Sequence, residues 1–225
     1  VAAGKKVIVL DALTYSGHRE NLQWIKGDWQ LVQGDIRNGA LIAQILAKYQ
    51  PSALVDFAAE SHVDNSILSP TSFIETNVIG CYTLLEAART HYATLSGEVR
   101  DKFRFLHIST DEVYGSLGDE GKFTEESPMR PNSPYSASKA AGDMFCRAWF
   151  HTYGLPVIVT NCTNNYGARQ FPEKLIPLTI TNALAGKNLP IYGDGKYVRD
   201  WIHAEDHCAG LSLALNKGRV GETYT

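Results

Sequence analysis

The stretch FLHISTDEVYG, residues 105–115, runs from a strand-like segment directly into a row of polar side chains. Its first part, FLHI at 105–108, has the bulky residues that a strand inside a sheet takes. Its second part, STDEVY at 109–114, sets two hydroxyl groups beside two carboxylates and ends in a tyrosine. Polar groups at the carboxyl end of a buried strand predict that this end faces a ligand cleft.

The composition is that of an ordinary globular protein. The chain has 225 residues, of which 44% are hydrophobic and 20% are charged, enough for one large domain or one and a half. The formal net charge is −3, so no basic surface predicts nucleic acid or an anionic membrane as a partner.

Targeting signals and cysteine spacing point to the cytoplasm. The longest apolar runs are too short for a bilayer-spanning helix, and no charged-then-apolar signal peptide opens the chain. The four cysteines form no CxxC pair, so we expect a reduced, cytoplasmic setting with unpaired thiols; they are Cys81, Cys146, Cys162 and Cys208.

Strand-like runs alternate with helical patterns along most of the chain. Runs rich in Val, Ile and Leu predict strands at residues 5–11, 29–35, 53–59, 104–110 and 156–161. Amphipathic stretches predict helices between them, at residues 39–50, 72–90 and 133–154. This alternation predicts an α/β fold with a doubly wound, Rossmann-like parallel sheet over residues 1–163.

After about residue 163 the pattern changes to segments rich in Gly, Pro and aromatic residues. Two further helices are predicted there, near 173–186 and 204–217. We therefore expect residues 164–225 to form a smaller C-terminal substrate-binding lobe, intertwined with the first domain.

Tyr135 and Lys139 form a second motif, at the start of the helix that follows Pro134. Their i, i+4 spacing places the phenol and the ammonium on one helix face. A nearby ammonium lowers the pKa of a phenol, which could then accept a proton from an alcohol. Alone this YxxxK pattern is common, but it gains weight beside a strand that ends in Ser109-Thr110.

Four segments together resemble the extended short-chain dehydrogenase/reductase family and, within it, the nucleotide-sugar 4,6-dehydratases. They are HISTDEVYG (107–115), PYSASK (134–139), NNYGARQFPEKLIP (164–177) and VRDWIHAEDH (198–207), and the resemblance runs over nearly all 225 residues. The Thr110-Asp111-Glu112 triplet is its specific element, since sugar epimerases of the same superfamily have small or hydroxyl residues in place of the two carboxylates.

The resemblance implies an NAD-dependent lyase that converts a nucleotide-activated hexose, dTDP-glucose, into its 4-keto-6-deoxy product. Such an enzyme oxidises C4, removes the C5 proton, expels the C6 hydroxyl and returns the hydride to C6. Two neighbouring carboxyl groups of different pKa can divide the elimination between them. By resemblance Glu112 is the base at C5 and Asp111 the acid at C6, while Thr110, Tyr135 and Lys139 serve the oxidation.

The resemblance also implies a set of NAD-binding positions. Asp11, at the end of the first predicted strand, would bind the adenosine ribose and disfavour the 2′-phosphate of NADP. The full set of implied cofactor residues is Asp11, Leu13, Thr14, Asp35, Ile36, Phe57, Ala58, Ala59, Ser61, Thr76, Tyr135, Lys139 and Asn165.

One departure from the family is plain: the sequence contains no Gly-rich phosphate loop. The family carries that loop between its first strand and first helix, so we expect the chain to begin after it and to stop within the second lobe, both domains being incomplete. The missing strand is central in such a sheet, and its absence would expose the edges of its neighbours.

On the substrate side the resemblance implies Ser61, Thr110, Asn164, Lys174, Leu175, Pro190, Tyr192 and Arg199. Arg199 suits a diphosphate, although an ion pair with Asp200 or Asp206 is an alternative. His203 and His207 have i, i+4 spacing but no third ligand, so no metal is expected. Residues 72–87 could pair with their copy in a homodimer, or could simply pack within one chain.

Two other functions remain open at this point. A nucleotide-sugar epimerase or decarboxylase of the same superfamily would share the fold and the YxxxK motif. A non-catalytic remnant that binds nucleotide sugars would explain the missing phosphate loop. The nucleotide base and the downstream pathway are not fixed by the sequence.

Overall fold

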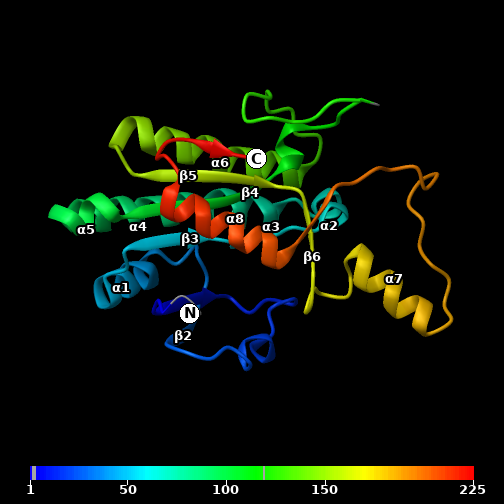
Figure 1. The fold of residues 1–225 in the computed structure, drawn as a ribbon, viewed down its shortest axis with the longest axis horizontal. Coiled ribbons are helices and arrows are strands. Elements are labelled where there is room, and N and C mark those ends of the chain that lie inside the picture. The colour runs from blue at the N-terminus through cyan, green and yellow to red at the C-terminus, as the bar shows by residue number, and fades with distance from the viewer. Residues whose placement is uncertain (2–3, 119) are drawn as a thin grey trace.

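A four-stranded parallel sheet forms the centre of the protein (Figure 1). The structure is a computed structural model and describes residues 1, 4–118 and 120–225. The strand order is β3-β4-β5-β8, with bounds Ala53–Asp56, Arg104–Thr110, Val157–Cys162 and Thr223–Tyr224. The predicted strands at 53–59, 104–110 and 156–161 are therefore confirmed, the first ending three residues earlier than expected.

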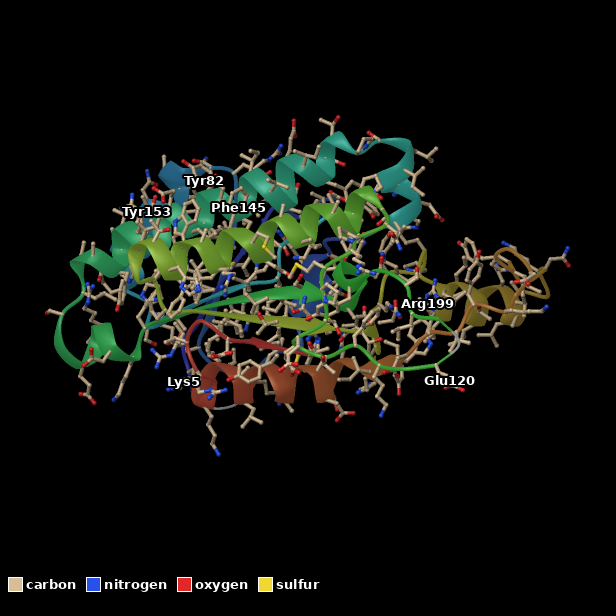
Figure 2. The ribbon with its side chains drawn as sticks, turned by 90° about the horizontal axis from the view of Figure 1, so that it is seen from above. Lys5, Tyr82, Glu120, Phe145, Tyr153 and Arg199 are labelled. Carbon is tan, nitrogen blue, oxygen red and sulfur yellow. The ribbon has the colours of Figure 1, made fainter. Side chains whose placement is uncertain are left out.

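Helices cover both faces of this sheet. Helices α1 (Gly39–Tyr49), α4 (Cys81–Thr94) and α6 (Pro134–Tyr153) cover one face, and α8 (Ala204–Lys217) covers the other (Figures 1 and 2). Strand β4 is buried from Phe105 onward because its alternate residues enter two different cores. Phe105 belongs to the cluster under α1, α4 and α6, whereas Leu106 and Ile108 belong to the cluster under α8.

Strands β1 (Val7–Asp11) and β2 (Trp29–Gln33) form a separate parallel pair. Within the described ranges β1 pairs only with β2, and β3 pairs only with β4, so each has one edge without a backbone partner. These are the exposed strand edges that the sequence predicts. Val55 on β3 is accordingly 38% exposed although it lies in a parallel sheet.

The C-terminal part of the chain leaves the sheet and returns to it. Strands β6 (Asn164–Tyr166) and β7 (Trp201–His203) pair in parallel, and α7 (Leu175–Leu184) lies between them in the sequence. Helix α8 then packs on β5, and β8 adds to the sheet beside β5. Helix α8 has the predicted bounds, while the three short strands β6, β7 and β8 were not predicted.

The predicted helix at 72–90 is wrong as a single α-helix. It is divided into α3 (Thr71–Phe73), a π-helical segment η2 (Ile74–Gly80) and α4. Shorter helical turns complete the fold: η1 (Arg19–Leu22), α2 (Val63–Leu68), α5 (Gly97–Lys102) and η3 (Asp111–Tyr114). Across the described ranges, no helix combines the length and apolar character that a bilayer crossing requires.

Substitution of Phe105 tests how much the core between the sheet and α4 contributes to stability. Its side chain is fully buried, so Phe105→Ala should lower the free energy of unfolding by about 3–5 kcal/mol. Leu184→Ala is the control, because Leu184 is 84% exposed and its loss should change stability by less than about 0.5 kcal/mol. Urea unfolding of both variants measures the difference; equal effects would contradict this account of the core.

Candidate active site

The carboxyl end of β4 carries Thr110, Asp111 and Glu112 into the turn η3. Thr110 is buried, and its hydroxyl accepts a hydrogen bond from the Glu112 backbone N–H at 3.3 Å. The same hydroxyl donates to Asp111 Oδ1 at 3.4 Å. The Thr110 side chain therefore caps the turn and fixes where the two carboxylates begin.

Helix α6 begins beside this turn because Ser133 and Ser136 cap it reciprocally. Each serine hydroxyl accepts from the other residue's backbone N–H at 3.0 Å, and Pro134 occupies the first helical position. This start places Tyr135 and Lys139 on the face of α6 that packs on β4. Both are buried, and Lys139 Nζ donates to the Ile108 carbonyl at 2.8 Å.

The expectation that Lys139 lowers the pKa of Tyr135 is wrong for this structure. Burial raises the pKa of Tyr135 well above its usual value, and the charge of Glu112 adds to the rise. The neighbouring Thr110 hydroxyl opposes this rise. Lys139 instead directs its ammonium into the sheet, toward the Ile108 carbonyl, so burial prevails over any effect of that charge.

Both carboxyl groups of η3 hold their protons more tightly than usual. Burial raises the pKa of Asp111, opposed by the neighbouring hydroxyl groups of Thr163 and then Thr110. Burial and then the charge of Asp111 raise the pKa of Glu112, while Arg199 and Lys174 oppose that rise. A raised pKa makes a carboxyl group better able both to give and to take a proton.

The π-helical segment η2 turns Asn77 toward the strand ends. Its side chain accepts from the Glu60 backbone N–H at 2.8 Å and donates to the Glu60 carbonyl at 2.9 Å. It also donates to Ser138 Oγ on α6 at 2.9 Å. Asn77 thus joins the segment after β3 to the helix that carries Tyr135. The sequence analysis missed it, although π-turns often occur at functional sites.

A pocket of about 140 Å³ lies between the loop after β1 and the segment before α7. It brings together the predicted cofactor residues Thr14, Ala59 and Ser61 with the predicted substrate residue Lys174. Lys174 Nζ donates to Ser61 Oγ at 3.3 Å. These four residues therefore lie together in one pocket.

Glu173 and Phe171 close the same pocket and were not predicted. The Tyr15 hydroxyl donates to Glu173 Oε1 at 2.8 Å, and the Tyr15 ring meets Phe171 edge-on at 5.5 Å. Desolvation and then the hydrogen bond with Glu173 raise the pKa of Tyr15 to about 12. Both residues lie in the NNYGARQFPEKLIP segment, so their position in that motif is the signal that could have found them.

The other predicted cofactor residues lie on neighbouring strand ends. Asp11 is exposed at the end of β1, and its Oδ1 accepts from the Leu13 N–H at 2.7 Å. Asp35 is paired with Arg37, while the Ile36 side chain is buried in the core, so only its backbone can reach a ligand. Phe57 is 59% exposed after β3, Ala58 packs on the core and Thr76 is half-buried on η2.

The predicted substrate residues are only partly brought together. Asn164 Nδ2 donates to the Asp200 carbonyl at 3.3 Å, and Leu175 is exposed at the first position of α7. Pro190 and Tyr192 are exposed on the long segment between α7 and β7, which extends away from the sheet (Figure 1). The structure does not place these two residues at the carboxylates.

Arg199 lies near the site, and the ion pairs that the sequence offered as an alternative to a diphosphate are not seen among the described residues. Within the described residues it forms no ion pair with Asp200 or Asp206; its guanidinium lies 5.5 Å from the Tyr197 ring centre. Its charge acts on Glu112, because it opposes the rise in the pKa of that carboxyl.

The two histidines of the last helix have structural contacts. His203 Nδ1 caps α8 by accepting from the Glu205 N–H at 3.4 Å, and His207 Nδ1 lies 2.8 Å from Asn165 Oδ1. Asn165, a predicted cofactor residue, is therefore held in place from α8.

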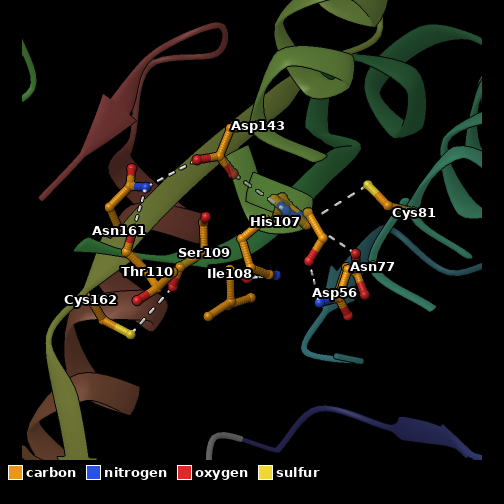
Figure 3. A network of polar contacts seen from close by, with 12 residues as sticks. Asp56, Asn77, Cys81, His107, Ile108, Ser109, Thr110, Asp143, Asn161 and Cys162 are labelled. Carbon is orange, nitrogen blue, oxygen red and sulfur yellow. Dashed lines mark hydrogen bonds and ion pairs between the residues drawn. The ribbon is translucent and has the colours of Figure 1, made fainter. Parts of the chain in front are cut away.

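A buried polar network, missed by the sequence analysis, lies beneath the site (Figure 3). His107 Nδ1 is 2.9 Å from Asp56 Oδ2, and His107 Nε2 is 3.5 Å from Asp143 Oδ1. The sulfur atoms of Cys81 and Cys146 lie beside the same ring, and with His107 they form a group of possible metal ligands within 4.8 Å. The nitrogen nearest to Cys81 is already engaged by Asp56, so the arrangement favours an ion pair.

The sequence model for the GDP-mannose 4,6 dehydratase family matches residues 1–225. The chain belongs to this family. The parallel sheet and the YxxxK helix are thus those of the Rossmann-like fold of the short-chain dehydrogenase/reductase class.

Individual relatives agree with this assignment. The chain is 59% identical to a dTDP-glucose 4,6-dehydratase of Xanthomonas campestris pv. campestris (strain B100), covering 100% of this chain and 64% of the relative. The crystal structure of DesIV, a dTDP-glucose 4,6-dehydratase from Streptomyces venezuelae with NAD and TYD bound, is 51% identical with a TM-score of 0.89. That match covers 98% of this chain and 66% of the other.

A UDP-glucose 4-epimerase from Thermotoga maritima, solved with UDP-glucose, shares the fold at a TM-score of 0.83 but only 27% identity, covering 95% of this chain and 66% of the other. The chain thus spans about 64% of the length of its curated dehydratase relative.

The raised pKa of Glu112 predicts a pH-dependent change in stability. The folded state holds the Glu112 proton above the usual pKa of 4.5, so it binds more protons than the unfolded chain just above that pH. Stability contributed by this group therefore falls as pH rises through that window. Glu112→Gln should be more stable than the unmodified protein at pH 7, and the gap should close as pH approaches 4.5.

Glu86→Gln provides the control of opposite sign. A hydrogen bond from Arg89 lowers the pKa of Glu86, so the folded state favours its ionised form and the substitution should destabilise the protein at pH 7. Urea unfolding at pH 7 and pH 5 measures both variants. Destabilisation by Glu112→Gln at pH 7 would contradict the burial of that carboxyl.

Proposed function

We propose that the complete protein dehydrates a nucleotide-activated hexose, with dTDP-glucose as substrate and dTDP-4-keto-6-deoxyglucose as product, using NAD. The observation that carries this proposal is the pair of carboxyl groups at Asp111 and Glu112, both with raised pKa, directly beside the buried phenol of Tyr135. Oxidation of an alcohol requires one proton acceptor; the elimination that follows requires an acid and a base as well.

Each residue has a role that follows from its place. Tyr135 and Thr110 would bind the C4 oxygen, and the phenolate form of Tyr135 would take its proton, although burial and the charge of Glu112 raise the pKa of that phenol. Once C4 is a ketone the C5 proton becomes acidic, and Glu112 is the base that removes it. Asp111, at the start of the same turn, gives its proton to the departing C6 hydroxyl. Lys139 holds the helix of Tyr135 against β4.

The residues present fit the ribose and nicotinamide parts of NAD. Asp11 offers an exposed carboxylate at a strand end, and the pocket beside Ala59 and Ser61 opens toward Lys174. The diphosphate part would need a glycine-rich phosphate-binding loop, which is not in these 225 residues. When bound, NAD supplies the acceptor and later the donor of the C4 hydride.

Lys174 and Arg199 support a nucleotide diphosphate as the anionic part of the substrate. Both cations act on Glu112 from different segments, so the carboxylates lie next to positive charge. A diphosphate between these cations would hold the hexose over Tyr135. Pro190 and Tyr192 would then have to approach with the 185–200 segment to contact the base.

Association and location are part of the same proposal. Tyr82, Phe145 and Tyr153 lie close together on the face of α4 and α6 (Figure 2), and Tyr82 and Tyr153 are 44% and 50% exposed. An apolar, aromatic helix face of this kind supports a homodimer formed through α4 and α6.

The four free cysteines support a cytoplasmic location. The division of the chain into residues 1–163 and 164–225 is part of the same proposal.

Glu112→Gln separates the oxidation from the elimination. The variant keeps the size of the side chain but has no base for C5, so oxidation at C4 should survive while water is retained. A single turnover should build up reduced nicotinamide, followed by its near-ultraviolet absorbance, and product formation should fall by at least about 100-fold. Deuterium at C5 should not exchange with solvent.

Asp111→Asn is the matched control, since it removes the acid and leaves the base. It should exchange C5 deuterium while losing water slowly, the opposite of Glu112→Gln. If Glu112→Gln formed product at the normal rate, the dehydratase proposal would fail. Interconversion of 4-hydroxyl epimers by the unmodified protein would instead establish an epimerase.

Asp11→Asn tests cofactor choice. The amide still accepts from the Leu13 N–H, so the loop should hold, but it no longer repels a 2′-phosphate. The preference for NAD over NADP should narrow by roughly tenfold, measured as the ratio of kcat/KM values with each cofactor. An unmodified protein that used both cofactors equally would contradict the role given to Asp11.

A further inference from the structure

A buried line of polar groups connects β3 to the catalytic end of β4 (Figure 3). It runs from Asp56 through His107 to Asp143, whose Oδ2 accepts from Asn161 Nδ2 at 3.1 Å. The same Asn161 nitrogen donates to the Thr110 carbonyl at 3.2 Å. The line therefore ends on the backbone of a residue that begins the catalytic turn.

His107 bears a positive charge between the two carboxylates. Its side chain is 2% exposed, and those of Asp56 and Asp143 are 1% and 2% exposed. Burial opposes the charge, but Cys81 and Asp56 outweigh it and raise the pKa of His107 to about 10, with Lys139 acting the other way. Gly142 makes room for this ring, because a methyl group there would lie 3.0 Å from His107 Nε2.

Two cations act on Asp143 in favour of its ionised form. Burial raises the pKa of this carboxyl, and the charge of His107 and then that of Lys139 act against the rise, as does the hydrogen bond from Asn161. A buried carboxylate without such partners would take up a proton instead. Of the groups that favour the anion at this place, the imidazolium of His107 acts most strongly.

The anion determines how the Asn161 amide is turned. Its nitrogen lies between two acceptors, Asp143 Oδ2 and the Thr110 carbonyl, and can donate one hydrogen to each. Its oxygen has no partner among the described residues. A neutral group at position 143 could donate to that oxygen, turn the amide over and leave the Thr110 carbonyl without a donor.

We propose that Asp143, held between His107 and Lys139, is a positioning residue that fixes Thr110 through the Asn161 amide. Thr110 is thereby fixed at its carbonyl, while its hydroxyl accepts from the Glu112 N–H and donates to Asp111 Oδ1. This inference rests on the proposed function only for its rate measurement. The Asp143 side chain is 2% exposed beneath the site, and it acts on Thr110 through Asn161.

The first test compares two equivalent substitutions on either side of the same imidazole. Asp143→Asn should slow the formation of reduced nicotinamide in a single turnover of the complete protein by at least about tenfold, with KM changed less than about threefold. Asp56→Asn removes the other carboxylate of His107, but Cys81, the larger cause of the raised pKa of that ring, remains, as do Asp143 and Asn161, so that rate should change less than about threefold. Equal losses in the two variants would show a general effect of the buried charges and overturn the proposal.

A double-mutant cycle tests the route. Asn161→Ala removes the donor to Thr110 and should cause a loss similar to that of Asp143→Asn, and the double variant should be no slower than Asn161→Ala. Additive losses, or a normal rate in Asn161→Ala, would overturn the proposal. Asn161→Ala leaves the His107 ion pairs intact, so it decides the matter even if Asp143→Asn fails to fold.

Nuclear magnetic resonance provides a measurement, the chemical shift, that does not depend on activity. The carbonyl carbon shift of Thr110 should move in the same direction in Asp143→Asn and Asn161→Ala and stay unchanged in Asp56→Asn; any other pattern would contradict the link. The His107 ring nitrogens should both be protonated at pH 7 in the unmodified protein. If that protein forms no reduced nicotinamide with nucleotide sugars, the proposed function fails while these shifts still decide the positioning role.

Discussion

The hydrogen bond from Lys139 to the Ile108 carbonyl is the contact on which the geometry of the site depends. It joins the helix that carries Tyr135 to the strand that ends in Thr110, and both partners are buried. Because β4 lies between β3 and β5, its end cannot move without disturbing two strand pairings. The phenol and the carboxylates are therefore held by the most enclosed part of the sheet, while the residues that would meet the nucleotide lie on exposed segments.

Polar side chains inside this core form hydrogen bonds between neighbouring elements. These bonds fix the relative positions of elements that apolar packing alone would not align. Asn77 joins the segment after β3 to α6, and Asn161 joins β5 and α6 to β4. Each amide has partners on two segments besides its own, so a shift of any one of them would leave a buried group without a hydrogen bond. This explains why a site for proton transfer rests on polar side chains as well as on the apolar clusters around Phe105 and Ile108.

Much of the fold follows from local sequence, and much of the site does not. Strand β4 and helix α8 could be predicted because their residues show burial and helical periodicity over a continuous stretch. The β6–β7 pair could not, since each strand has three residues and the partners are far apart in the chain. The π-helical turn at Asn77 was missed because a single extra residue per turn leaves no clear trace in the apolar pattern.

The buried network shows the same limit. Asp56 and His107 are 51 positions apart and meet only because β3 and β4 pair in one register. Asp143, by contrast, follows Lys139 by one helical turn, so the pattern of α6 contained a clue to it. The error over the pKa of Tyr135 has a related cause, since spacing gives proximity to a charge but says nothing of desolvation.

The exposed segment between α7 and β7 has a practical consequence for biochemical work. Lys187, Lys196 and Arg199 lie on it and are open to trypsin, whereas the chain on either side is held by pairing of β6 with β7 and of β5 with β8. A cut there would leave α8 packed on β5. The nicked protein would migrate as one particle on a sizing column and separate into two fragments only in denaturant, so an intact elution profile is no proof of an intact chain.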